Sequence, residues 1–270
     1  MGFFGKLFEK KICSVCDGEI GLLGNRKLED GNLCKECAAK LSPWFDDRRN
    51  STVEQIKEQL EYRERNKEKV AAFCVTRSFG ERTKVLLDED AGVFMVTAET
   101  SPQRMAQANP DVLAFSDVTG CDVDIDENKV ELKQRNSEGK EISYNPPRYR
   151  YDYEFYVKIY VRNPYFDDMR VKLNGSPVCI EYQRGSNPRG ANMLLGGVQS
   201  FSPERDMEYR QYKQMGEELK RCLMQVRKAQ REEAAAAAAP KAATTCPYCG
   251  ATTIPDQNGC CEYCGGAVND

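Results

Sequence analysis

The spacing of hydrophobic positions changes along the chain, and each change predicts a different kind of element. Residues 51–72 carry apolar side chains at intervals of three and four, which predicts a helix linking the N-terminal part to the next domain. Ser51 and Glu54 have the S-x-x-E spacing of a capping box at the start of this helix. Its apolar stripe consists of Val53, Ile56 and Leu60.

From residue 73 the hydrophobic period falls to two, which is typical of half-buried strands. The segment "VELKQRNSEGKEISY" reads as two short strands around a turn, and several further short runs alternate in the same way. We therefore expect an antiparallel β domain built of short strands over residues 73–201. Its most regular strand has on one face Tyr149, Tyr151, Tyr153, Phe155, Val157, Ile159 and Val161.

A helical period returns after Ser202, which precedes a proline suited to the first helical position. Over residues 202–240 we expect a long helix, and then an alanine-rich spacer that ends at Pro240. The apolar stripe of this helix consists of Tyr212, Met215, Leu219, Cys222, Leu223 and Val226.

Composition and charge narrow the classes of protein. Hydrophobic residues make up 40% of the chain, charged residues 30%, and the formal net charge is −3, so no overall basic field attracts nucleic acid. No apolar run is long enough to span a membrane, and the start has no secretory signal, so we expect a cytoplasmic protein. Residues 2–12 predict an amphipathic helix, which packs on its own module or contacts a membrane surface.

The candidate chemistry lies in the cysteines, of which the chain has 13, whereas it has no histidine. Eight of them form C-x-x-C pairs, two pairs near each end of the chain. In a reducing compartment such pairs favour metal binding over disulfides. The pairs are Cys13/Cys16, Cys34/Cys37, Cys246/Cys249 and Cys261/Cys264.

The C-terminal pairs, within residues 241–270, follow the spacing C-x2-C-x11-C-x2-C and open the similar stretches "CPYCG" and "CEYCG". Two such knuckles offer Zn²⁺ four thiolates in a tetrahedron. So short a segment has almost no apolar core, and the metal must therefore supply its fold. We predict a structural zinc ribbon, with a redox dithiol and an iron–sulfur site as alternatives, and Cys260 outside the ligand set.

The N-terminal pairs, within residues 1–50, follow the spacing C-x2-C-x17-C-x2-C. The second pair runs into "AAKL", a helix start, and "NRKLEDGN" supplies a hairpin turn between the pairs. A knuckle, a hairpin and a pair at a helix N-terminus are typical of a treble-clef-like module, and the helix dipole favours thiolates there. We predict a second Zn²⁺ site here.

Both predicted sites have four sulfur ligands, whereas a catalytic zinc keeps an open position for water. Four thiolates and one Zn²⁺ together have a charge of −2. Two filled sites therefore lower the formal net charge from −3 to −7. The sequence therefore predicts structural zinc and a protein that is not an enzyme.

Three segments resemble known families. The stretch "CSVCDGEIGLLGNRKLEDGNLCKECAAKLSPWF" resembles the DUF4428 family of bacterial zinc-binding domains of unknown function. The tail is similar to double-knuckle zinc ribbons, and "DVLAFSDVTGCDVDI" looks like a strand motif of PH-like or GRAM-like domains. The last resemblance implies a bent antiparallel sheet capped by a helix, which binds proteins or membranes rather than catalysing a reaction.

Together these features predict an α+β protein with a treble-clef-like zinc module, a PH-like antiparallel domain with long helices, and a C-terminal zinc ribbon. We expect a non-catalytic adaptor for protein partners, with recognition surfaces on the exposed ribbon face and at Leu41, Trp44 and Phe45.

Two alternatives remain open. A nucleic-acid-binding zinc-finger protein would use the basic residues Arg26, Lys27, Arg48 and Arg49 near the first site. A thiol redox protein would use the cysteine pairs themselves.

Overall fold

The computed structural model describes residues 11–183, 201–238, 243–254, 256 and 259–268. The chain divides into two compact units, the first ending at Arg227 and the second beginning at Lys228. Of the helix predicted over residues 2–12, only Lys11 and Ile12 are described, and they form a strand instead of a helix. Residues 184–200 and the end of the spacer lie outside the described residues. The described part is a mixed α/β protein whose sheets are antiparallel, as predicted at that level.

The N-terminal module consists of two small hairpins and a short helix. Strands β1 (Lys11–Ile12) and β2 (Glu19–Ile20) form the first hairpin, and β3 (Arg26–Lys27) and β4 (Asn32–Leu33) the second. Helix α1 (Lys35–Ala38) and the 3-10 turn η2 (Asp47–Asn50) follow. Its core combines cysteines with aliphatic side chains, namely Cys13, Ile20, Leu28, Leu33, Cys34, Cys37, Leu41 and Ile56.

The predicted linking helix is α2 (Val53–Ala72), but a different capping box starts it. Thr52 is the N-cap: its hydroxyl accepts from the Gln55 backbone N–H, and the Gln55 side chain accepts from the Thr52 N–H. Ser51 is instead buried and donates to the Asp47 carbonyl at 2.9 Å, which closes η2. The expected Ser51/Glu54 box was therefore wrong by one residue.

A buried polar cluster joins this helix to the β domain. Arg63 and Asp111 form an ion pair at 2.7 Å between side chains that are 5% and 0% exposed. The Ser42 hydroxyl donates to the second oxygen of Asp111 at 2.7 Å, and Arg63 also donates to the Lys40 carbonyl at 3.1 Å. A buried charge is costly unless it is paired and hydrogen-bonded, and here the partners come from different segments. The cluster therefore connects the segment after α1, helix α2 and the β domain.

The first sheet of the β domain is a meander of four strands in chain order: β5 (Arg77–Phe79), β6 (Lys84–Asp88), β7 (Val93–Thr97) and β8 (Val112–Ala114). Helix α3 (Pro102–Ala108) interrupts it between β7 and β8. Ser101 caps this helix, and its first residue is a proline. The period-two analysis did not anticipate α3.

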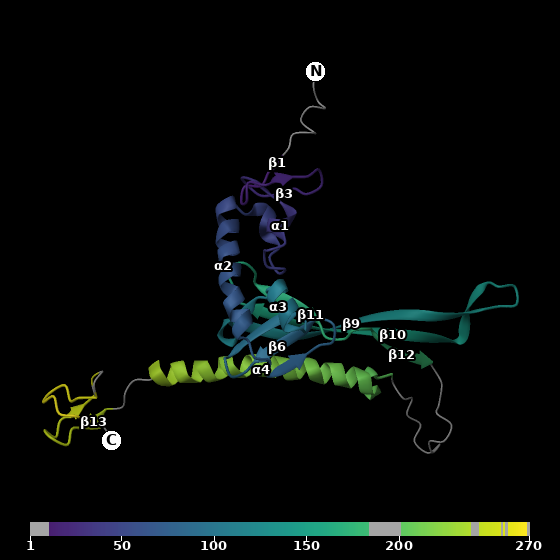
Figure 1. Ribbon diagram of the computed structural model, residues 1–270. Coiled ribbons are helices and arrows are strands. Elements are labelled where there is room, and N and C mark those ends of the chain that lie inside the picture. Colours follow the sequence, from purple (N-terminus) through teal and green to yellow (C-terminus); the bar gives the residue numbers. More distant parts are fainter. Residues whose placement is uncertain (1–10, 184–200, 239–242, 255, 257–258, 269–270) are drawn as a thin grey trace, which may run out of the picture. The chain divides into compact units, whose positions relative to one another are not determined.

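The second sheet is dominated by two long strands, β9 (Val118–Arg135) and β10 (Glu141–Val161), which pair along almost their whole length (Figure 1). The other edge of β10 is shared by β11 (Asp168–Lys172) and β12 (Val178–Gln183). The expectation of short strands was wrong here, because β10 continues past its two prolines through a register shift between Ser143 and Arg148. The alternation itself is confirmed: odd-numbered residues 153–161 are all buried.

After the turn η4 (Pro203–Arg205), helix α4 (Met207–Ala238) packs on the β domain through its first turns (Figure 1). It begins later than predicted, because Pro203 lies in η4 and the Asp206 carboxylate accepts the Tyr209 N–H at 2.9 Å. Gly216 permits a close approach, since a Cβ there would lie 2.9 Å from a methyl of Val123. The buried side chains of this face are Tyr209, Tyr212, Leu219 and Leu223.

Candidate metal centres

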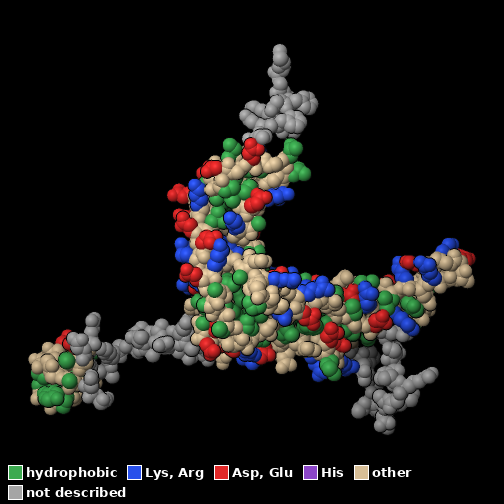
Figure 2. All heavy atoms as spheres, viewed as in Figure 1, with side chains coloured by type: hydrophobic (Ala, Val, Ile, Leu, Met, Phe, Trp, Pro, Cys, Tyr) green, Lys and Arg blue, Asp and Glu red, His purple; other side chains and the backbone are tan. Residues whose placement is uncertain are grey.

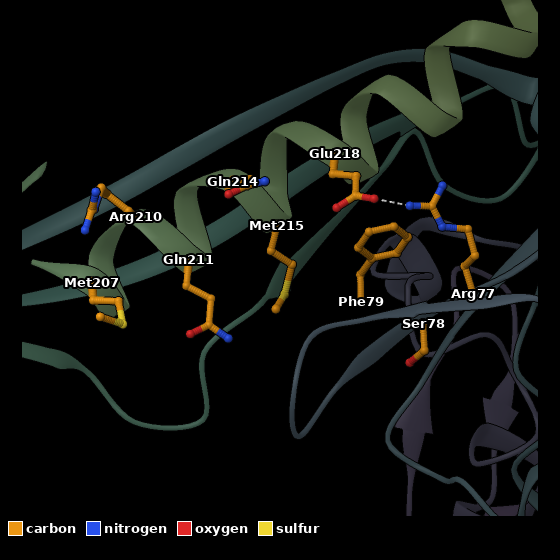
Figure 3. Close-up of a pocket in the computed structure, with 9 residues that line it drawn as sticks. All are labelled: Arg77, Ser78, Phe79, Met207, Arg210, Gln211, Gln214, Met215 and Glu218. Atoms are coloured by element: carbon orange, nitrogen blue, oxygen red, sulfur yellow. Dashed lines mark hydrogen bonds and ion pairs between the residues drawn. The ribbon is translucent and has the colours of Figure 1, made fainter.

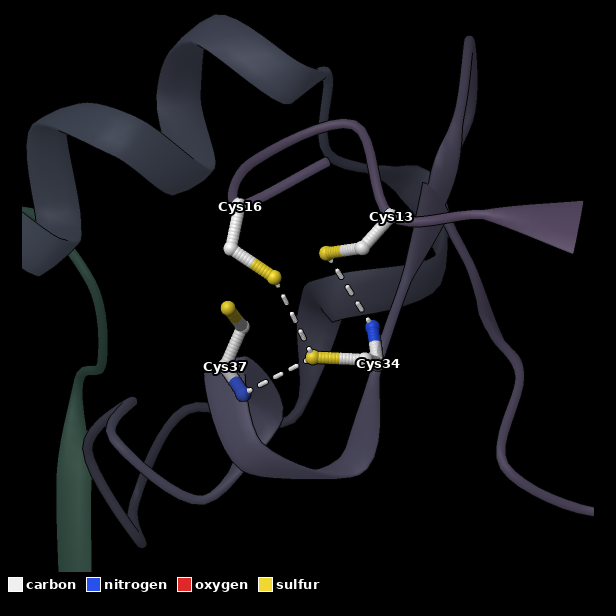
Figure 4. A group of neighbouring side chains, drawn as sticks. All are labelled: Cys13, Cys16, Cys34 and Cys37. Carbon is white, nitrogen blue, oxygen red and sulfur yellow. Dashed lines mark hydrogen bonds between the residues drawn. The ribbon is translucent and has the colours of Figure 1, made fainter. Parts of the chain in front are cut away.

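The N-terminal cysteines converge from two different parts of the module (Figure 4). Cys13 and Cys16 belong to the turn between β1 and β2, whereas Cys34 and Cys37 begin helix α1. One ligand atom from each of the four lies within 4.8 Å of the others. The sequence-predicted set is thus brought together in one cluster.

Backbone N–H groups point at this cluster. Cys34 is the N-cap of α1, and its sulfur accepts the Cys37 N–H at 3.3 Å. The Cys34 N–H in turn donates to the sulfur of Cys13 at 3.4 Å. Such N–H groups stabilise thiolate charge, which is the form of cysteine that binds a metal.

The surroundings shift the pKa values of Cys13, Cys34 and Cys37 in different directions. Burial raises the pKa of Cys13, but N–H donors from Cys34, Cys16 and Val15 outweigh it and lower that pKa to about 6. Burial and the neighbouring thiols raise the pKa of Cys37, and burial raises that of Cys34. A bound divalent cation would favour the thiolate form of all four cysteines.

The C-terminal cysteines form an equivalent cluster in the second unit. Cys246, Cys249, Cys261 and Cys264 also place their ligand atoms within 4.8 Å of one another. Strands β13 (Thr244–Thr245) and β14 (Thr252–Thr253) flank the first pair. Burial opposes ionisation of Cys261, but the N–H groups of Tyr263 and Cys264 lower its pKa to about 6.

Three of the cysteine turns share one backbone pattern. Cys13, Cys246 and Cys261 each accept, on the carbonyl, an N–H from four residues later, at 2.8 to 2.9 Å. Each also donates its own N–H to the carbonyl five residues later. The residue four positions after the first cysteine, which donates the first of these N–H groups, has a positive φ. It is Gly250 or Gly265 in the C-terminal unit but Asp17 in the N-terminal module. Glycine adopts this conformation without strain, whereas aspartate does so at a cost.

The donor chemistry of both clusters fits zinc, which binds four thiolates tetrahedrally in closed structural sites. In the N-terminal module Cys13, Cys16, Cys34 and Cys37 would hold the ion, and in the second unit the other four cysteines would do so. Cys260, next to that second cluster, is half-buried and pairs in an isolated bridge with Ala267 instead. Among the other cysteines, Cys121 is buried in the β domain, and burial raises its pKa to about 12.

The residues predicted to contact a partner are less exposed than expected. Leu41 is only 7% exposed and belongs to the core of the N-terminal module, so it offers no surface. Trp44 is half-buried against the β-domain core, and Phe45 packs on its own module. Trp44 and Phe45 nevertheless line a cleft of about 530 Å³, whose other wall is the loop 164–168.

A second cavity, of about 760 Å³, lies between strand β5 and helix α4 (Figure 3). The charged groups Arg77 and Glu218 face each other across it as an ion pair, and Arg77 also contacts the sulfur of Cys222 at 3.0 Å. Methionine and glutamine side chains complete much of its wall. The charges of Arg77 and Glu218 therefore already satisfy each other, and Arg210 is the third charged residue of the wall.

The profile of one protein family, described as a domain of unknown function (DUF4428), matches residues 11–59. The match covers the N-terminal cysteine cluster and the first turns of α2, so this part of the predicted resemblance is confirmed. No curated protein and no solved structure matched the chain. Among the described residues, no helix combines the length and apolar character needed to cross a membrane.

Proposed function

We propose that this protein is a non-catalytic zinc-binding adaptor that joins protein partners, in part at a membrane surface. The observation that carries the proposal is that each cluster brings four sulfur donors within 4.8 Å of one another. Four thiolates complete the tetrahedral shell of zinc and leave no position for a reacting water. The metal would therefore stabilise the fold, and the surfaces around it would bind the partners.

The finer fold assignments belong to this proposal. A cysteine pair at the start of α1 opposite a knuckle supports a treble-clef-like module. The four-stranded meander β5–β8, the sheet β9–β12 and the helix α4 support a PH-like domain. The long hairpin of β9 and β10 departs from that architecture, since its outer half, around residues 127–148, is largely exposed.

The cleft at Trp44 is the surface that we infer for a protein partner. Its aromatic walls come from Trp44, Phe45, Tyr165 and Phe166. Five carboxylates and no lysine or arginine line it, and only Asp168 has a basic partner, Lys158 at 3.1 Å, among the ion pairs of the described residues. Aromatic faces and carboxylates together suit a cationic side chain, so the partner segment would be basic.

Trp44 is the only tryptophan of the chain, so its fluorescence reports directly on this cleft. A lysine-rich synthetic peptide should change the emission of the full-length protein in a saturable way, whereas a glutamate-rich peptide of equal length should not. The variant Asp46→Asn/Asp47→Asn should weaken the binding, and Asp90→Asn, an exposed carboxylate elsewhere, should not. Equal responses from all three proteins would remove the cleft from the proposal.

The metal part of the proposal is tested by native mass spectrometry, which should find two zinc ions per full-length chain. Protein that carries no zinc but cycles reversibly between thiol and disulfide would support the redox alternative instead.

One observation favours the nucleic-acid alternative: the basic residues of the first module gather in one place. Burial lowers the pKa of Arg48, and the nearby charges of Arg26 and Arg49 lower it further. A gel-shift assay on generic DNA and RNA across a salt series tests this reading, because phosphate contacts give a steep salt dependence. Negligible binding at low salt would exclude it.

A further inference from the structure

Leu22 and Leu23 occupy the tip of a β-turn in the N-terminal module. The Gly24 N–H donates to the Gly21 carbonyl at 2.9 Å, so the two leucines are the central residues of that turn. Their side chains are 85% and 87% exposed. Turn tips normally carry Gly, Pro, Asn, Asp or Ser, so two adjacent exposed leucines at this position call for a function.

The turn is held firmly by the module beneath it. Ile20, which directly precedes the turn, is 7% exposed and belongs to the module core. Strand β2 pairs with β1, whose Ile12 is 57% exposed and adds apolar surface. Figure 2 shows hydrophobic side chains at this outer end of the module. The leucines therefore project from a turn that directly follows a buried residue of a paired strand.

The Arg26 guanidinium lies beside the turn, and Glu19, Lys35 and Glu36 line a pocket together with residues 20–24. The Arg26 guanidinium donates to the Leu23 carbonyl at 3.3 Å, and the Arg48 guanidinium donates to the Lys27 carbonyl at 3.1 Å. Arg49 is close enough to lower the pKa of Arg48, after burial and Arg26. Lys27, which follows Arg26 in the chain, is exposed. In the part of the chain that the structure describes, Arg26, Lys27, Arg48 and Arg49 have no carboxylate within ion-pairing distance.

We propose that the leucine turn, residues 21–24, inserts into the interfacial layer of an anionic lipid bilayer, with the four cations placed over the headgroups. A projecting pair of leucines beside unpaired cations matches the apolar interior and the negative surface of such a membrane. Nucleic acid would use the cations but would leave the leucines in water. This proposal deepens the membrane part of the proposed function and does not depend on the cleft at Trp44.

The test is co-sedimentation of the full-length, zinc-loaded protein with vesicles. We expect binding to vesicles of phosphatidylcholine and phosphatidylglycerol in equal parts, and much weaker binding to phosphatidylcholine alone. The variant Leu22→Ser/Leu23→Ser should lower the partition coefficient by about a hundredfold, since both side chains leave the bilayer. Met207→Ser, which removes a side chain that is 76% exposed on α4, should leave it unchanged.

A second variant tests the charges. Lys27→Gln/Arg49→Gln removes two exposed cations and should weaken binding to the anionic vesicles by about tenfold. The matched pair Lys133→Gln/Arg135→Gln, on the exposed hairpin of β9 and β10, should not. Native mass spectrometry showing two zinc ions in each variant excludes unfolding as the cause.

Three results would overturn the proposal. The first is no binding of the unaltered protein to either vesicle, and the second is binding that the leucine variant retains, since another segment would then carry it. The third is a leucine variant that no longer binds a protein partner but still binds the vesicles. Because the cleft is tested by Trp44 fluorescence, failure of the membrane contact and failure of the protein contact are seen separately.

Discussion

The two four-cysteine clusters have the same donors but very different surroundings. In the N-terminal module the cysteines share a core with leucines and isoleucines, and α2 adds Ile56 to it. In the second unit the buried apolar core of the described residues comprises only Cys246, Cys261 and Val268. A metal bound by the same four donors would therefore complete an existing core in the N-terminal module but would replace the core in the second unit.

The difference extends beyond the clusters. The N-terminal module is attached to the β domain through the Ser42–Asp111–Arg63 contacts, so its stability adds to that of a larger body. The second unit forms its own compact body from Lys228 onward. Loss of the metal should therefore unfold only the surroundings of the cluster in the first unit, whereas it should unfold the whole of the second unit.

The largest expected effect comes from breaking the second cluster with Cys261→Ser. Structural zinc contributes roughly 10–16 kcal/mol in small zinc modules, far more than a core of one valine can replace. We expect residues 243–268 to lose all protection in hydrogen–deuterium exchange measured by mass spectrometry. The first unit, which ends at Arg227, should keep its protection.

The neighbouring variant Cys260→Ser is the matched control, because Cys260 lies outside the four-cysteine cluster. It should retain two zinc ions and native protection. Persistent protection of residues 243–268 in the Cys261 variant would contradict the comparison, because it would mean that the second unit has another source of stability.

An intermediate effect is expected from Asp111→Ala, which tests the attachment of the first module. The change leaves Arg63 buried without a counter-charge, which should lower the free energy of unfolding by about 3–5 kcal/mol. Urea denaturation followed by circular dichroism measures this, with Asp90→Ala, an exposed carboxylate, as the control. A loss below about 1 kcal/mol, as for a surface ion pair, would show that the polar cluster does not hold the module.

The smallest effect comes from exchanging the residues of the cysteine turns. Asp17 has a φ of 56°, so Asp17→Gly should relieve strain and stabilise the first module by about 1 kcal/mol. Gly265→Asp, with a φ of 72°, should weaken the second unit by a similar amount. Competition for zinc with a chelator measures the effect of each substitution. If both substitutions change the zinc affinity in the same direction, the two turns are not equivalent.

The sequence predicted those features that depend on local spacing. Cysteines separated by two residues must lie on one turn, so the pairs were found. The burial of alternate residues along β10 follows from its period of two. It did not reveal Leu41 as a core residue, because three apolar residues after a short helix look alike whether they face inward or outward. The turn at Leu22 also escaped notice, although Gly21 and Gly24 flank it, because leucines at the two central positions are unusual in a turn.

Features that depend on distant segments could not be predicted. The wall of the cleft opposite Trp44 comes from residues 164–168, more than a hundred positions later, and no local pattern connects the two. The same holds for Asp111, which reads as a loop residue yet accepts from Ser42 and Arg63. Only the folded chain brings such groups together.

The placement of the clusters at opposite ends of the chain also sets an order in time. A growing chain contains all the cysteines of the first cluster once Cys37 has left the ribosome, whereas the second must wait for Cys264. At a synthesis rate of about 5–20 residues per second, these events lie roughly 10–50 s apart. If both clusters bind zinc, each newly made molecule would take up zinc twice, early and late, and a shortage that arises during synthesis would leave the first module folded and the second unit unfolded.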